Sequence, residues 1–259
     1  MLRPTGMARA TRSIRAVEGT PSPVARARVR WGLPDVAIAW FVGIVGSAMA
    51  WPLADRDVST AKQPVEFIVA AVLLQNLAIA GTLWAFSRFK GQGSLRRDFG
   101  LDWPLRTMRA RLVAGWLALG VVLQFAASIL LLPINRIADL DESAQEVGRV
   151  VERANGLELV LMLGGVVVVA PVVEELLFRG ALLRALQRRF SIAVAVFTSA
   201  AVFAGVHVLG DPGSYPYLPA WLLLGLVSGW AAARTGNLSR SILLHMGFNL
   251  IAAVLLAVG

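Results

Sequence analysis

The chain of 259 residues contains no cysteine and only two histidines. The absence of cysteine excludes disulfide bonds, cysteine nucleophiles and thiolate metal ligands. Charged residues are also scarce, at 16%, and 57% of the residues are hydrophobic, whereas about 25% of the residues in soluble domains are charged. This balance excludes an ordinary soluble domain, a disordered chain and a disulfide-stabilised secreted module. It predicts a protein whose solvent is the lipid bilayer.

Long apolar stretches recur along the chain. About 20 consecutive apolar residues form a helix that can cross the hydrocarbon core of a bilayer. The sequence therefore predicts an all-α, polytopic bundle of about seven transmembrane helices, within a range of six to eight. We expect the spans at residues 35–54, 65–86, 111–132, 157–178, 191–209, 218–233 and 240–258. Most tryptophans fall near span ends and are interpreted as interfacial anchors: Trp40, Trp51, Trp84, Trp103, Trp116, Trp221 and Trp230.

The basic residues are concentrated in alternate loops. The first 30 residues and the loops at 87–111, 179–190 and 234–240 carry 20 of the 25 Lys and Arg residues. Because Lys and Arg accumulate on the cytoplasmic side, we expect a multi-pass plasma-membrane protein with a cytoplasmic N-terminus and an external C-terminus. Topology then explains the formal net charge of +9, and no nucleic-acid partner is expected because no nucleic-acid-binding motif accompanies it.

Composition divides the chain into three regions. Residues 1–30 are basic, contain several prolines and lack an apolar period, which predicts a disordered cytoplasmic tail. Residues 31–156 hold the first three spans and their amphipathic loops, and those spans contain almost no ionisable residues. Residues 157–259 hold nearly all ionisable residues of the apolar stretches, so any chemistry is expected there.

Six polar or charged side chains, which cost free energy inside a membrane, interrupt the apolar stretches of this last region: Glu174, Glu175, Arg179, His207, His245 and Asn249. A charge at the bilayer centre costs roughly 2.5–3.5 kcal/mol on insertion scales, so such residues usually pair and line a cavity. Glu175 and Arg179 are four residues apart and can pair on one helix face, whereas Glu174 points away. Glu174 and His207 are equidistant from a turn near residue 190, which brings them to one depth in two antiparallel helices.

Hydrolysis of a peptide bond suits these side chains. The reaction needs an activated water, a group that moves its proton and donors for the oxyanion. Glu174 and His207 could hold and deprotonate the water, while Arg179 orients Glu175.

The two remaining residues, His245 and Asn249, could donate to the oxyanion. A zinc site of Glu174, His207 and His245 is the alternative mechanism, because two histidines and one glutamate form a common catalytic zinc set. The sequence lacks a His-Glu-x-x-His pair, however. A serine–histidine triad has little support because no serine stands in a nucleophile setting at the same depth.

Three spaced motifs follow one another in this region: Glu174-Glu175-x-x-x-Arg179, Phe203-x-x-x-His207 and His245-x-x-x-Asn249. They resemble the EExxxR, FxxxH and HxxxN motifs of the CPBP family, also called Abi proteins. This family includes CAAX prenyl endopeptidases and bacteriocin-processing or self-immunity membrane proteins, among them proteins like lysostaphin resistance protein A. The resemblance covers about residues 157–255, and residues 97–101 are similar to a weaker feature of the family.

The resemblance implies an all-helical intramembrane endopeptidase that cleaves a membrane-proximal or C-terminal tail, with or without a lipid modification. It assigns the water to Glu174 and His207, a supporting role to Glu175 and Arg179, and the oxyanion to the third motif. The family is treated as glutamic peptidases, so no metal or other cofactor is expected. Two alternatives remain open: a non-proteolytic immunity or scaffold protein that keeps the motifs, and a proton-coupled transporter.

Overall fold

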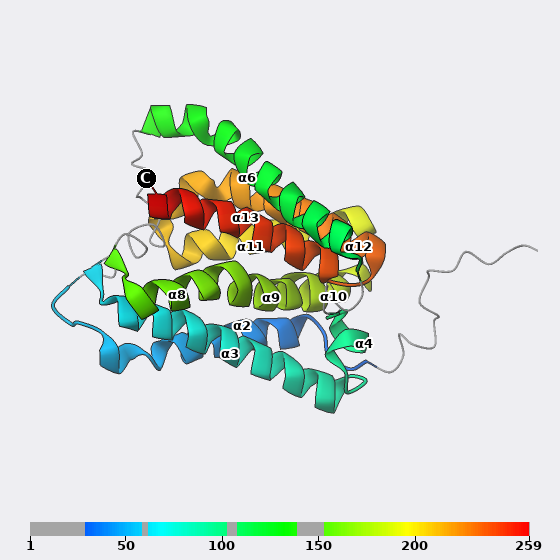
Figure 1. Cartoon of the computed structure of the whole chain (residues 1–259). Helices are drawn as coiled ribbons and strands as arrows, with labels where there is room; N and C mark the ends of the chain where they lie inside the picture. The colour runs from blue at the N-terminus through cyan, green and yellow to red at the C-terminus, as the bar shows by residue number, and fades with distance from the viewer. Residues whose placement is uncertain (1–28, 59–61, 103–107, 139–152, 259) are drawn as a thin grey trace, which may run out of the picture.

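The computed structural model describes residues 29–58, 62–102, 108–138 and 153–258. Within these ranges all regular structure is helical (Figure 1). Nearly all of the basic N-terminal tail predicted at residues 1–30 lies outside the described residues.

The helices of the described residues follow one another along the chain. They are α2 (Leu33–Ala48), η1 (Trp51–Leu53), α3 (Val65–Lys90), α4 (Leu95–Phe99), α6 (Ala110–Ala138), α8 (Gly156–Gly164), η4 (Gly165–Val169), α9 (Ala170–Glu174), η5 (Glu175–Leu182), α10 (Leu183–Gln187), α11 (Ile192–Gly210), η6 (Pro212–Tyr217), α12 (Leu218–Thr235) and α13 (Ser239–Val258).

Six segments of the described part are long and apolar enough to cross a membrane: Leu33–Leu53, Val65–Lys90, Ala110–Pro133, Gly156–Gln187, Ile192–Gly210 and Gly213–Thr235. They coincide with the first six predicted spans. The seventh predicted span coincides with α13, several of whose last side chains lie outside the described residues. The prediction of an all-α polytopic bundle is therefore confirmed.

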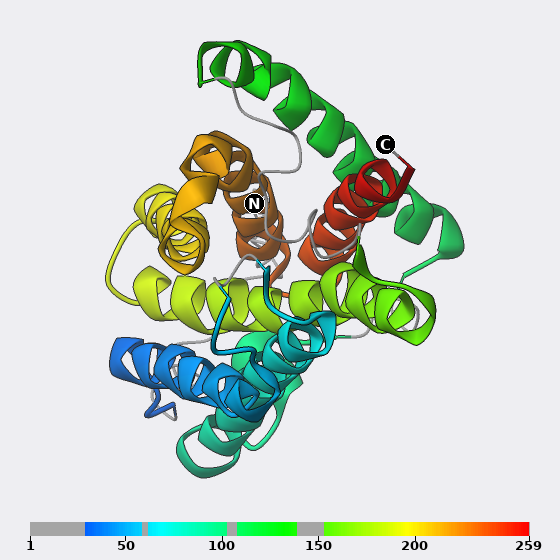
Figure 2. The same cartoon turned by 90° about the vertical axis from the view of Figure 1, so that its left-hand side faces the viewer.

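The long segment Gly156–Gln187 runs through the middle of the bundle. Helices α2 and α3 lie on one side of it, and α11, α12 and α13 lie on the other, with α6 packed on the outer side of α13 (Figures 1 and 2). Leu176, Leu177 and Phe178 of this segment are almost completely buried. The polar residues of the same segment are thus enclosed by helices from both halves of the chain.

The loops with many basic residues meet at one end of the bundle. The start of α2 is tied to the end of α3 by the Arg30 N–H, which donates to the carbonyl of Lys90 at 2.8 Å. The turn between α12 and α13 is tied to the loop after α4, because the Leu238 N–H donates to the carbonyl of Gly100 at 2.9 Å. We call this the basic end; its assignment to the cytoplasm stays a prediction.

Helices α6 and α13 approach each other closely where two glycines face the opposite backbone. A Cβ atom added at Gly120 would lie 2.8 Å from the backbone nitrogen of Phe248 and would also meet the Leu244 carbonyl. A Cβ atom added at Gly247 would meet the carbonyl of Leu117. Small residues permit such backbone approach in membranes, where van der Waals packing drives helix association. This crossing fixes α13, and with it two candidate site residues.

We predict that G120A lowers the stability of the protein by about 1–3 kcal/mol, the usual cost of overpacking. The matched control is G115A on the same helix, where an added Cβ would meet nothing within 4 Å. Unfolding midpoints of both variants in one detergent measure the difference. Equal shifts for the two variants would contradict the close crossing.

Candidate active site

The winding of the central segment, Gly156–Gln187, changes at the two adjacent glutamates. Glu174 is the last residue of the α-helical turn α9, and Glu175 is the first residue of the π-helical segment η5. A second π-helical segment, η4, precedes α9. Single π-helical turns are rare and are found frequently at functional sites. The irregular winding therefore flanks Glu174 on both sides and contains Glu175 and Arg179.

Proline accounts for one irregularity and for the position of Asn249. The Ala170 N–H donates to the carbonyl of Gly165, so the next bond of this pitch would need an N–H from Pro171. Proline has none, which leaves the carbonyl of Val166 without that donor. The Asn249 side chain on α13 supplies it, because its Nδ2 donates to this carbonyl at 2.9 Å. Asn249 thus fastens α13 to the central segment, using one of its two amide N–H groups.

The glutamate and arginine of the first motif form the ion pair that their spacing predicted. Arg179 Nη1 lies 3.0 Å from Glu175 Oε1, and both side chains are fully buried. The guanidinium also lies 4.3 Å from the centre of the Phe203 ring, a cation–π contact that strengthens when water is excluded. The pair therefore compensates two charges in the apolar interior.

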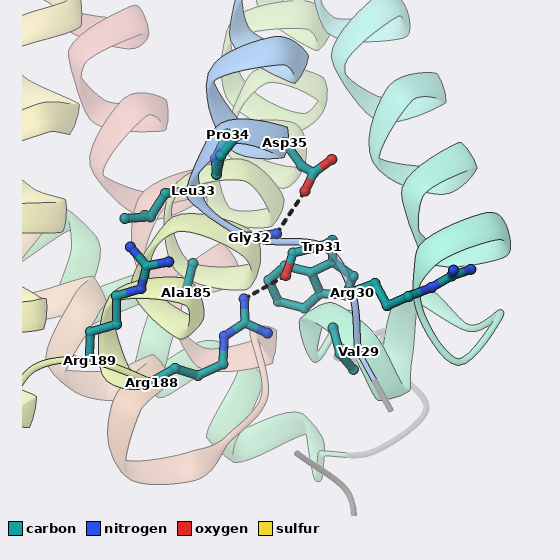
Figure 3. A pocket seen from close by; sticks show the side chains of 10 residues that line it. All are labelled: Val29, Arg30, Trp31, Gly32, Leu33, Pro34, Asp35, Ala185, Arg188 and Arg189. Carbon is teal, nitrogen blue, oxygen red and sulfur yellow. Dashed lines mark hydrogen bonds between the residues drawn. The ribbon is translucent and has the colours of Figure 1, made fainter. Parts of the chain in front are cut away.

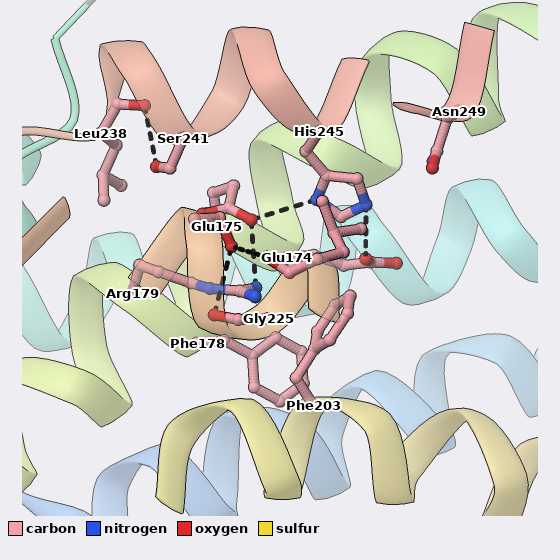
Figure 4. Close-up of polar contacts among 12 residues, drawn as sticks. Glu174, Glu175, Phe178, Arg179, Phe203, Gly225, Leu238, Ser241, His245 and Asn249 are labelled. Atoms are coloured by element: carbon pink, nitrogen blue, oxygen red, sulfur yellow. Dashed lines mark hydrogen bonds and ion pairs between the residues drawn. The ribbon is translucent and has the colours of Figure 1, made fainter. Parts of the chain in front are cut away.

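His245 lies between the two glutamates rather than apart from them (Figure 4). Its Nδ1 is 3.0 Å from Glu175 Oε1, and its Nε2 is 3.6 Å from Glu174 Oε2. A carboxylate only accepts hydrogen bonds, so Nδ1 carries the proton of the shorter contact. His245 is 2% exposed, while the Glu174 side chain keeps 26% of its surface accessible. Glu174 is therefore the carboxylate of the pair that a substrate or water can reach.

His207 is held by its own helix. Its Nδ1 lies 2.8 Å from the carbonyl oxygen of Phe203. Because that oxygen can only accept, Nδ1 carries the hydrogen, and Nε2 of the neutral ring is left as an acceptor. Among the interactions of the described residues, Glu174 acts electrostatically on His207 but makes no direct hydrogen bond with it.

Two aromatic residues complete the surroundings of the histidines. The Phe203 ring centroid lies 4.6 Å from that of His207 and 5.7 Å from that of His245. The Trp221 ring lies 4.7 Å from His207 in a tilted arrangement. The interpretation of Trp221 as an interfacial anchor therefore misses its main contact, whereas Trp51 and Trp84 are exposed, as expected for anchors. Its position near a span end gave no signal that α11 would pack against it.

The described residues contain no group of three His, Asp or Glu side chains that could hold a metal ion. The alternative set of Glu174, His207 and His245 is therefore not brought together as a ligand set in this structure. A mechanism without metal stays a prediction.

A comparison with family models bears on the region that holds the candidate site. The model described as "Type II CAAX prenyl endopeptidase Rce1-like" matches residues 156–251. This region resembles the Rce1-like family. The match confirms the resemblance to CAAX prenyl endopeptidases, and all six candidate residues lie inside it. No curated protein and no solved structure matches the chain.

The Rce1-like region combines groups that a hydrolase requires. Among the candidate residues, Glu174 is a partly accessible carboxylate and His207 is a histidine whose Nε2 can accept a proton. A second carboxylate, Glu175, is bound by Arg179 and His245. At the level of the family, the match supports a CAAX-type membrane protease.

We predict that E175Q destabilises the protein by about 3–5 kcal/mol, because removing one partner leaves the other charge buried without compensation. The double variant E175Q/R179M should recover part of this loss. R96Q is the matched control: its ion pair with Asp102 is 3.3 Å long, but the Arg96 side chain is 73% exposed, so it contributes about 1 kcal/mol or less. Unfolding midpoints in detergent measure all three variants, and an E175Q protein as stable as the wild type would refute the analysis of the pair.

Proposed function

We propose that the protein is an intramembrane endopeptidase that hydrolyses a peptide bond in a membrane-proximal segment or C-terminal tail. The observation that carries the proposal is the meeting of Glu174, Glu175, Arg179, His207 and His245 within one enclosed part of the bundle. Three separate helical segments contribute these residues. The substrate would be a peptide or protein, with or without a lipid modification, because a membrane-embedded site receives its substrate from or beside the bilayer.

The reaction would begin with a water molecule held between Glu174 and His207. The Glu174 carboxylate and Nε2 of His207 are both acceptors, so each can take a hydrogen bond from this water. The water oxygen forms a bond to the carbonyl carbon of the peptide as its proton passes to Glu174. Glu174 then gives the proton to the nitrogen of the departing amine as the carbon–nitrogen bond breaks. This sequence makes the enzyme a peptidase of the glutamic type.

The remaining candidate residues would support the reaction by orienting the His245 ring and by donating to the oxyanion. Glu175 is held by Arg179 and in turn accepts from Nδ1 of His245, which fixes the orientation of the imidazole. The Nε2 of His245 then faces the reacting side of the site, near Glu174. It can donate to the oxyanion only when the ring carries both protons. Asn249 would assist from the same helix with its second amide N–H, since the first is bound to Val166.

The protein would act in the plasma membrane, with its N-terminus in the cytoplasm and its C-terminus outside. The concentration of basic loops at one end of the bundle supports this orientation.

We predict that E174Q lowers the cleavage rate by at least about 100-fold, because a general base typically contributes a factor of 10²–10⁴. H207Q should lower the rate to a similar degree, because it removes the imidazole that holds the water beside Glu174. The assay uses purified protein in detergent and quenched fluorescent tail peptides, each with and without a prenyl group on a cysteine. E66Q serves as the matched control because Glu66 is exposed at the start of α3, and it should cleave like the wild type.

Retained cleavage in both E174Q and H207Q would refute the catalytic assignment. A wild-type protein that cleaves no peptide of the library would instead favour a non-proteolytic role.

We further predict that a chelator leaves the cleavage rate unchanged, because the proposed reaction activates water with protein groups alone. The same assay measures the rate before and after treatment with 1,10-phenanthroline. Loss of activity that added zinc restores would favour the alternative set of Glu174, His207 and His245.

A further inference from the structure

A cavity of about 420 Å³ lies at the basic end, between the start of α2 and the residues that follow α10 (Figure 3). Its lining includes three arginines, Arg30, Arg188 and Arg189, and one acidic residue, Asp35. The acidic charge is already compensated, because Asp35 Oδ1 lies 2.5 Å from Lys90 Nζ and Oδ2 accepts from the Gly32 N–H at 2.8 Å. The cavity therefore has an excess of positive charge.

Two of its lining residues are held in place by one another. Arg188 donates from Nη2 to the carbonyl of Trp31 at 2.8 Å, and its guanidinium lies 4.3 Å from the centre of the Trp31 ring. Trp31 is only 5% exposed, and its indole N–H has no hydrogen-bond partner among the described residues. A buried N–H without a partner is uncommon and costs free energy. Trp31 contributes to the cavity by positioning Arg188.

The electrostatics of the arginines also favour an anion. The pKa of Arg188 is lowered, first by burial and then by the adjacent charge of Arg189, against the attraction of Asp35. An anion placed between the two guanidinium groups would relieve both effects. Guanidinium groups bind phosphate with two parallel hydrogen bonds, which makes a phosphate group the natural fit.

Apolar surface continues from the cavity along the outside of the bundle. On α2, Pro34 lines the cavity, and Ile38 and Phe41 follow on the same face at 47% and 64% exposure. Beyond Arg189, Phe190 and Ile192 are 51% and 55% exposed. A ligand with a charged head and apolar chains would therefore find surfaces for both parts.

We propose that this cavity binds the phosphate headgroup of an anionic phospholipid, with the acyl chains along the exposed apolar face of α2. Arg188 and Arg189 would hold the phosphate, and Trp31 would position Arg188. The site is separate from the six candidate catalytic residues, and the proposal does not depend on proteolysis.

The test is lipid binding to the full chain in an uncharged maltoside detergent, followed by native mass spectrometry. Dioctanoyl phosphatidylglycerol should give one saturable site, and dioctanoyl phosphatidylcholine should bind more weakly. R189Q should weaken phosphatidylglycerol binding about 5-fold, since one basic residue near anionic lipid contributes about 1 kcal/mol.

The matched control is R97Q/R234Q, which removes two exposed positive charges from the same end but none from the cavity lining. It should bind phosphatidylglycerol like the wild type. The melting temperature without lipid shows that each variant is folded, and R189Q should keep the wild-type value.

Three results would overturn the proposal. The first is an equal loss of binding in R97Q/R234Q and R189Q, which would indicate general attraction to the basic end. The second is equal binding of phosphatidylglycerol and phosphatidylcholine in the wild type. The third is displacement of phosphatidylglycerol by about 10 mM inorganic phosphate, which would indicate a site for free phosphate instead of a lipid.

Discussion

The buried ion pair between Glu175 and Arg179 constrains the whole site. Moving a charge from water into an apolar interior costs several kcal/mol even after relaxation, and a partner offsets this cost only with favourable geometry. In this bundle the pair is 3.0 Å long with neither side chain exposed. Glu175 also contacts His245, and Arg179 lies over Phe203. The charges thus fix the positions of α11 and α13 around the central segment.

The same constraint separates the roles of two adjacent glutamates. Glu175 is fully buried, with its Oε1 against a cation and an imidazole, so a reacting molecule does not reach it. Glu174 is one residue earlier, and the α-to-π transition directs it to a different, partly accessible surface. Two identical side chains therefore acquire different chemistry from their surroundings alone, which is the arrangement that an acid–base site needs.

The sequence predicted the features that depend on spacing within one helix or on membrane cost. The Glu175–Arg179 pair follows from a separation of four residues, and the helical bundle follows from the apolar stretches. Contacts between helices could not be predicted in the same way. His245 lies against both glutamates, but the sequence predicted only its depth in the membrane. The bond from Asn249 to the Val166 carbonyl requires knowing that Pro171 leaves this carbonyl free and that α13 passes beside it. The close crossing at Gly120 and Gly247 places α13 beside this carbonyl. In the sequence, however, these two glycines look no different from glycines such as Gly115, at which an added Cβ would meet nothing.

The arginines at the basic end show why counting charges gives only part of their role. A count assigns Arg184 and Arg188 to topology, because Lys and Arg on one side orient the chain in the membrane. In the folded protein, however, Arg184 donates to the carbonyls of Asp98 and Gly236, and Arg188 donates to that of Trp31. These bonds join the end of the central segment to the first helix, to α4 and to the turn before α13. Arginines that the charge count assigns to topology therefore also hold together the helices that carry the site, so their substitution would disturb the packing of these helices.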